Sequence, residues 1–153
     1  MKALMFTNEF PPYTYGGAGA HVEYLSRELS HLLPIEVRCF GDQHLEQGNL
    51  KVHGLPLGET PFAAPKPLHS VLGAVQRCWQ MNAEGVGADL IHCHTWYTHL
   101  GGIMAKLNYG IPLVITTHSL EPLRPWKREQ LAGGYDFSLW VEKTALEMAD
   151  AII

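Results

Sequence analysis

Short apolar runs alternate along this chain with segments in which apolar residues recur every three or four positions, and this alternation constrains the fold more than any other feature. Runs of the first kind predict strands, and segments of the second kind predict helices. Strands and helices that alternate in this way are typical of βαβ units. We therefore expect an α/β fold with a Rossmann-like, doubly wound, mostly parallel sheet.

The apolar pattern places each expected element. Strands are predicted over residues 3–6, 35–40, 49–55, 89–93, 112–116 and 149–153. Helices are predicted over residues 20–33, 71–79, 96–107 and 137–148, with the apolar stripe of each in the core, Leu32, Trp79, Leu107 and Trp140 included. The partial alternation in residues 35–40 is typical of a strand near a sheet edge. Residues 58–67, with three prolines, are expected to form an irregular connection, and residues 118–134 a polar loop.

Composition limits the size and the setting of the protein. With 153 residues, 46% of them hydrophobic, the chain suits one globular domain. Its 11 basic and 15 acidic side chains leave no broad positive field, so we do not expect nucleic acid as a partner. No apolar run is long enough for a membrane span or a signal peptide. Cys39, Cys78 and Cys93 are odd in number and scattered, which predicts free thiols and a cytoplasmic protein.

The glycine-rich segment after the first strand is the first candidate site. Ligands of open parallel sheets bind at the carboxyl ends of the strands, which directs attention to the loops after Phe6, Cys93 and Thr116. The first of these loops contains Tyr15-Gly16-Gly17-Ala18-Gly19 and leads into a helix, where backbone N–H groups and the helix dipole favour an anion. The spacing is neither GxGxxG nor GxxxxGK[ST]. A phosphate-binding turn and a turn that merely joins strand to helix both fit.

Histidines mark three places near the expected crevice. His92 and His94 fall on one face of a strand because side chains alternate. His118 lies in the polar run that closes the next strand, and His21 in the first turn of the first helix could face the crevice or lie along the helix flank. A metal site is not expected, because the chain has no CxxC, HxxxH or HExxH pair. A Ser-His-Asp hydrolase is not expected either, because GxSxG is absent.

Cations surround a tryptophan in the last polar loop. Arg124, Lys127 and Arg128 flank Trp126. Arg forms bidentate pairs with phosphate, and an aromatic face packs on a sugar. This loop therefore predicts a sugar or phosphate contact, although a solvated loop without a specific role has a similar composition.

Several motifs together resemble the N-terminal domain of the retaining GT-B glycosyltransferases of family four, most closely the actinobacterial-type glycogen synthases, which include the α-maltose-1-phosphate synthases. The motifs are Asn8-Glu9-Phe10-Pro11-Pro12, Tyr15-Gly16-Gly17-Ala18-Gly19, His21-Val22, Asp89-Leu90-Ile91-His92-Cys93-His94-Thr95-Trp96, Thr116-Thr117-His118-Ser119-Leu120-Glu121-Pro122, Arg124-Pro125-Trp126-Lys127-Arg128-Glu129-Gln130-Leu131 and Glu142-Lys143-Thr144-Ala145. They are spread over the whole chain.

The resemblance implies transfer of glucose from a nucleotide sugar, ADP-glucose, to an α-glucan or glucose 1-phosphate, with retention at the anomeric carbon and without a metal or other cofactor. It implies that Gly16, Gly17 and Gly19 bind the donor diphosphate and that His118 contacts the transferred sugar as the catalytic residue. Acceptor and sugar contacts are expected from Glu9, Tyr15, His21, His94, Thr95, Trp96, Arg124, Lys127 and Arg128. Better-known bacterial glycogen synthases carry Lys and Asp where this chain has Tyr15 and Thr95.

The resemblance also implies a second domain. Residues 1–153 would be the acceptor-side half of a GT-B fold, and the C-terminal, donor-binding domain would be absent from this chain, so we expect residues 1–153 alone to bind ligands weakly and not to turn over. The three cations motivate a narrower hypothesis, that Lys127→Ala and Arg128→Ala impair use of glucose 1-phosphate more than glycogen extension. A stand-alone sugar or sugar-phosphate binding module remains an alternative, whereas an NAD-dependent epimerase is disfavoured by the missing GxGxxG.

Overall fold

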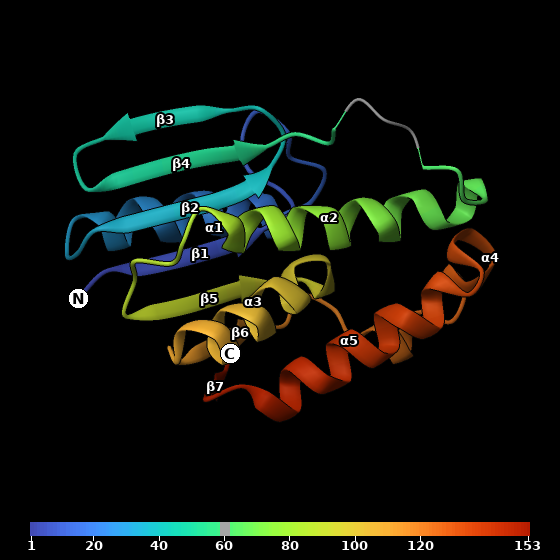
Figure 1. Cartoon of the computed structure of the whole chain (residues 1–153). Coiled ribbons are helices and arrows are strands. Elements are labelled where there is room, and N and C mark those ends of the chain that lie inside the picture. The colour runs from blue at the N-terminus through green and yellow to red at the C-terminus, as the bar shows by residue number, and fades with distance from the viewer. Residues whose placement is uncertain (59–61) are drawn as a thin grey trace.

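A computed structural model describes residues 1–58 and 62–153 and shows a single seven-stranded sheet with helices on both faces (Figure 1). The strands are β1 (Ala3–Thr7), β2 (Ile35–Phe40), β3 (His44–Gln47), β4 (Leu50–Leu55), β5 (Leu90–His94), β6 (Leu113–Thr116) and β7 (Ala151–Ile152). The α-helices are α1 (Gly17–Ser30), α2 (His69–Ala83), α3 (Trp96–Tyr109), α4 (Lys127–Leu131) and α5 (Gly134–Met148). Two 3₁₀ turns, η1 (Lys66–Leu68) and η2 (Glu121–Leu123), precede α2 and α4.

The sheet has the topology of a doubly wound fold. Its strand order is β3-β4-β2-β1-β5-β6-β7, and every neighbouring pair is parallel except β3 and β4. From β1 the chain first builds β2 and β4 on one side, and then crosses to build β5, β6 and β7 on the other. The order therefore reverses between β1 and β5, where such sheets bind ligands. The predicted α/β fold class is confirmed.

Strand β1 lies at the centre of the sheet and is buried on both faces. Ala3 and Met5 pack into the apolar cluster beside α1, whereas Leu4 and Phe6 pack into the cluster beside α2, α3 and α5. This division follows from the alternation of side chains along a strand. A parallel strand covered by helices on both faces needs an unbroken apolar run, which is what residues 3–6 supply.

Strand β3 was not predicted. It forms an antiparallel hairpin with β4, at the edge of the sheet, through a turn in which Gly48 has a φ of 57°. All four residues of β3 are exposed, so the segment carries almost no apolar signal. Strand β2 has a neighbour on each side, with β4 between it and the hairpin edge.

Other expectations need correction. Helix α1 begins at Gly17 and ends at Ser30, rather than spanning residues 20–33, and Leu32 lies outside it with 79% of its surface exposed. The large side chains of Trp79, Leu107 and Trp140, which the helical stripes assigned to the core, are exposed. The segment 118–134 is not only a loop, since it contains η2 and α4.

Residues 59–61 of the expected irregular connection lie outside the described residues, and the part that follows includes η1. The three cysteines are free and buried. Across the described ranges, none of the helices combines the length and the apolar character needed to cross a bilayer.

Candidate active site

A crevice with a volume of about 640 Å³ opens at the carboxyl ends of β1 and β5, where the strand order reverses. Its walls come from the loop after β1, the start of α1, the β5–α3 junction and the segment after β6. The lining residues are Asn8, Glu9, Tyr15, Gly16, Gly17, Ala18, Thr95, Trp96, Tyr97, His118, Ser119, Arg124, Lys127 and Gln130. Asn8 and Gln130, which are 122 positions apart in the sequence, therefore line the same site.

The glycine-rich loop presents backbone N–H groups to this crevice. Gly16 is the N-cap of the 14-residue helix α1, and as a glycine it has no side chain of its own to cap that end. The first N–H groups of a helix have no partner within it and favour an anion. A Cβ at Gly16 or Gly17 would have no heavy atom within 4 Å, so both positions leave space for a ligand.

The Glu9 carboxylate occupies part of this loop. Its Oε2 accepts hydrogen bonds from the backbone N–H of Tyr15 at 3.0 Å and of Gly16 at 2.9 Å. Gly19 faces the loop rather than the open crevice, since a Cβ there would lie 2.7 Å from Cγ2 of Thr14 and 3.0 Å from Cβ of Glu9. Gly19 therefore permits the helix to approach the loop.

Thr95 connects the end of β5 to the loop that follows β1. Its φ of 66° lies in the left-handed region, which is uncommon for a residue other than glycine. The Thr95 hydroxyl donates a hydrogen bond of 2.6 Å to Oδ1 of Asn8. The hydroxyl of Thr98 donates to the carbonyl oxygen of His94 and so fixes the end of β5. Trp96, by contrast, is nearly buried and packs with Val71, Leu131 and Tyr135.

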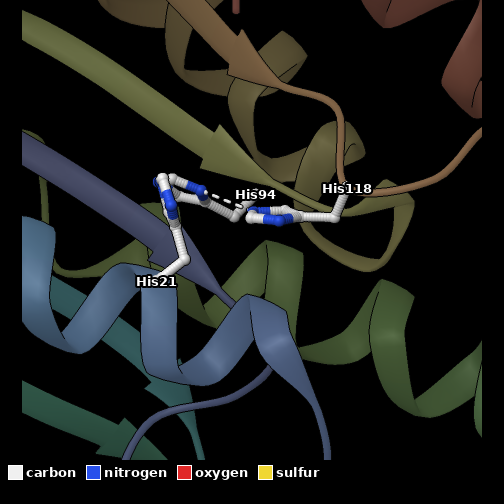
Figure 2. Close-up of side chains that lie close together, drawn as sticks. All are labelled: His21, His94 and His118. Carbon is white, nitrogen blue, oxygen red and sulfur yellow. Dashed lines mark hydrogen bonds between the residues drawn. The ribbon is translucent and has the colours of Figure 1, made fainter.

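Three histidines from three segments converge beside the crevice (Figure 2). His21 extends from α1, His94 from the end of β5 and His118 from the segment after β6. Nδ1 of His94 lies 3.1 Å from Nε2 of His118 in a hydrogen bond. The His21 ring centroid lies 5.6 Å from that of His94 and 5.1 Å from that of His118. Of the two orientations left open for His21, the structure shows the one that faces this cluster.

Burial lowers the pKa of three histidines in this region, His92, His94 and His118. It lowers the pKa of His92 to about 4, with His21 and His118 adding to the effect. It also lowers the pKa of His94 well below the ordinary value. The pKa of His118 is lowered by partial burial and by His21, while Glu9 acts in the opposite direction. A neutral imidazole has one nitrogen that accepts a hydrogen bond or a metal ion and one that donates.

The cationic wall of the crevice rests on a buried carboxylate. Glu121 is fully buried and accepts hydrogen bonds from Nζ of Lys127 at 3.0 Å and from the hydroxyl of Ser138 at 3.1 Å. Arg124 lies 3.6 Å from the same carboxylate and also donates to the hydroxyl of Ser119. Glu142 accepts the backbone N–H of Glu121 and so holds η2 on α5.

Arg128 is placed differently from the other two cations. It is not among the residues that line the crevice, and it forms a bidentate pair with Asp136, with N–O distances of 2.9 and 2.6 Å. The structure therefore supports a crevice contact for Arg124 and Lys127 and gives none for Arg128. Adjacent residues of α4 point in different directions, which separates Arg128 from Lys127.

Several crevice residues were not among the predicted site residues. Asn8, Ala18, Tyr97, Ser119 and Gln130 line it as well. Asn8 and Ser119 each lie in a loop that follows the carboxyl end of a strand, and this position in the sequence could have identified them. Tyr97 stacks on Trp96 with centroids 4.3 Å apart, and its orientation depends on the turn at Thr95.

Comparison with known proteins identifies relatives along the whole chain. The profile of the family described as Glycosyltransferase Family 4 matches residues 15–153. Alpha-maltose-1-phosphate synthase of Mycolicibacterium smegmatis is 48% identical over all 153 residues, which correspond to 37% of that protein. The chain thus spans little more than a third of this curated relative.

Solved structures share the fold at low sequence identity. Sucrose-phosphate synthase of Thermosynechococcus elongatus superposes with a TM-score of 0.70 and 18% identity, over 99% of this chain and 42% of that one. The catalytic domain of starch synthase IV of Arabidopsis thaliana, bound to ADP and acarbose, gives a TM-score of 0.59 and 15% identity, over 78% of this chain and 34% of that one.

Proposed function

The chain belongs to glycosyltransferase family 4, and we propose that it is the N-terminal, acceptor-side domain of a retaining glucosyltransferase. In this proposal, glucose passes from ADP-glucose to glucose 1-phosphate or to an α-glucan, without a cofactor besides the nucleotide sugar. The observation that carries the proposal is the single crevice that brings together the start of α1, His118 and two cations.

The start of α1 supports a nucleotide-sugar donor. Gly16 and Gly17 carry no Cβ, have open space in front of them and stand at the positive end of a helix. A diphosphate that leaves with negative charge is stabilised by donors already aimed at it. The ADP bound to the starch synthase relative is the basis for naming adenine as the base.

His118 is placed for contact with the transferred glucose. It lines the crevice together with Gly17 and Thr95, so a glucosyl group attached to a diphosphate at α1 would lie beside it. The bond from C1 to the diphosphate oxygen breaks, a bond from C1 to the acceptor oxygen forms, and the acceptor's proton leaves with the diphosphate. A neutral imidazole or its backbone carbonyl stabilises a sugar ring that becomes positive in the transition state.

Arg124 and Lys127 favour an acceptor that carries a phosphate. Both line the crevice, and Lys127 is held there by Glu121. The name of the M. smegmatis relative describes a product with one phosphate on maltose. Addition of one glucose to glucose 1-phosphate yields such a product, so we place the acceptor phosphate at these two cations.

A panel of substrates tests the proposal. The protein expressed from its complete reading frame is incubated with ADP-, UDP- or GDP-glucose and with glucose 1-phosphate or glycogen, and the anomeric configuration of the product is determined by NMR. We expect ADP-glucose and glucose 1-phosphate to give an α-linked maltose phosphate. Binding of free sugars without any transfer from a nucleotide sugar would instead support a sugar-binding module.

Two matched variants test the acceptor assignment. Arg124→Met removes a guanidinium that lines the crevice, whereas Arg128→Met removes one that pairs with Asp136 on the outside. We expect Arg124→Met to lower kcat/KM for glucose 1-phosphate by about tenfold or more, the effect of losing one charged hydrogen bond, and to affect glycogen extension much less. Arg128→Met should change neither. Equal losses on both acceptors in Arg124→Met would contradict the assignment.

A further inference from the structure

The histidine cluster has the geometry of a metal site. One ring nitrogen from each of His21, His94 and His118 can be chosen so that the three atoms lie within 4.8 Å of one another. Two tetrahedral nitrogen ligands of Zn²⁺ lie roughly 3.3 Å apart, because each Zn–N bond is about 2.0–2.1 Å. Nδ1 of His94 and Nε2 of His118 are already 3.1 Å apart. This separation is therefore close to that of two ligands of one ion.

The third ligand can make the larger movement. The His21 side chain is exposed near the start of α1, so its rotamer is not fixed by packing. His94 is fully buried at the end of β5 and is supported by Thr98, whose hydroxyl binds its carbonyl oxygen. The three residues thus combine a fixed ligand, a half-buried ligand and an adjustable ligand, and His118 also lines the crevice.

The protonation state of the cluster also suits a metal ion. In the hydrogen bond between His94 and His118, one proton lies between two nitrogens. For both nitrogens to bind a metal, that proton must leave or move to the far nitrogen of its ring. Nε2 of His94 is buried and has no partner among the described residues, so it can carry a proton without breaking an existing hydrogen bond.

From this arrangement we propose that His21, His94 and His118 form a binding site for a borderline transition-metal ion, Zn²⁺ or its near equivalents Co²⁺ and Ni²⁺. Three imidazoles and one open position suit these ions. Mg²⁺ and Ca²⁺, which prefer oxygen ligands, do not fit the site. An ion here engages His118, so metal and donor glucose exclude each other, and the ion inhibits transfer. This second statement rests on the proposed function.

Metal titration of the purified protein tests the site without reference to activity. We expect isothermal titration calorimetry to show one Zn²⁺ per chain, no binding of Mg²⁺, and an intense visible absorption band on addition of Co²⁺, which indicates a tetrahedral site. His21→Gln and His118→Gln should each weaken binding at least about tenfold. His31→Gln is the matched control, because His31 is an exposed histidine at the other end of α1.

Each outcome decides one statement. Absence of Zn²⁺ binding, or equal weakening in His31→Gln, would overturn the metal site whatever the enzyme does. The metal site would also be overturned if the His21→Gln and His118→Gln variants bound Zn²⁺ as tightly as the unmodified chain. If Zn²⁺ binds but does not inhibit glucosyl transfer competitively with the nucleotide sugar, the statement that metal and donor exclude each other would be overturned. Absence of glucosyl transfer in the metal-free protein would instead contradict the proposed function and leave the metal site standing.

Discussion

The Glu9 carboxylate lies against the N-terminus of α1, where its Oε2 accepts the backbone N–H of Gly16 at 2.9 Å and that of Tyr15 at 3.0 Å. An internal anion thus orders the loop that is proposed to receive the donor diphosphate. Glu9 follows the end of β1, and Gly16 precedes the first residue of α1. The Glu9 side chain therefore connects the end of the strand directly to the start of the helix. The loop is therefore shaped before a ligand arrives.

Removal of the Glu9 carboxylate should disorder the loop that contains Tyr15 and Gly16 and should have little effect on the stability of the fold. We expect Glu9→Ala to lower kcat/KM for the nucleotide sugar by about tenfold, because the two N–H groups lose their common acceptor. Glu9→Gln should lose less, since an amide oxygen still accepts hydrogen bonds. Steady-state kinetics of the complete enzyme measures this order. A Gln variant as impaired as the Ala variant would contradict loop positioning as the role of Glu9.

Gly17 and Gly19 should respond to alanine in opposite ways. A Cβ at Gly17 meets nothing in the chain, so Gly17→Ala should leave the melting temperature unchanged or raise it slightly, by the greater helix propensity of alanine, and yet impair donor use. A Cβ at Gly19 would collide with Thr14 and Glu9, so Gly19→Ala should lower the melting temperature.

Thermal unfolding and donor KM of the two alanine variants check this pair of expectations. An unchanged donor KM in Gly17→Ala would remove Gly17 from the donor site. A Gly19→Ala protein as stable as the unmodified chain would show that the loop yields to a methyl group. Gly16→Ala serves as a second variant with open space before it.

The fold could be predicted from sequence because the interior strands β1 and β6 are largely buried. Residues 3–6 and 113–115 therefore read as continuous apolar runs. β3 could not be found, since its exposed residues His44, Leu45, Glu46 and Gln47 are ordered by pairing with β4 rather than by burial.

The candidate site was predicted in part. Strand-end position located the loops after Phe6, Cys93 and Thr116, which contain Glu9, Thr95 and His118, because the carboxyl ends of parallel strands meet at one edge. The convergence of His21 with His94 and His118 was not visible, since it depends on the position of α1 relative to β5. Likewise, Lys127 lines the crevice and Arg128 does not, because their side chains leave α4 in different directions. The positions of the two residues in the sequence did not reveal these directions.

The buried pair of Glu121 and Lys127 should contribute to stability. Glu121→Gln leaves the Lys127 ammonium with a neutral partner in a buried position, which we expect to lower the free energy of unfolding by roughly 3 kcal/mol. The double variant Glu121→Gln/Lys127→Met should be less destabilised than the sum of the two single variants. Urea unfolding of the four proteins gives the coupling. Additive losses would show that the two side chains act independently, and Glu129→Gln, on the exposed side of α4, is the control.

Acid should destabilise the fold through its buried histidines, of which His99 is one. His99 is 1% exposed in α3, and burial lowers its pKa from the ordinary 6.5 to about 3. Neither ring nitrogen has a partner among the described residues. The unfolded chain therefore binds a proton near pH 6.5 that the folded chain refuses until about pH 3, so stability is full above the first value and is lost progressively toward the second.

His99→Leu should flatten this pH dependence. It removes one group that must lose its proton on folding, and at neutral pH it also removes two unsatisfied nitrogens from the core, so stability there should be unchanged or higher. We expect urea unfolding at about pH 7.5 and about pH 5 to differ less in this variant than in the unmodified chain. His92, whose pKa is lowered to about 4, maintains part of the slope. His31→Gln should retain the full slope, and an equal slope in His99→Leu would show that His99 does not titrate with unfolding.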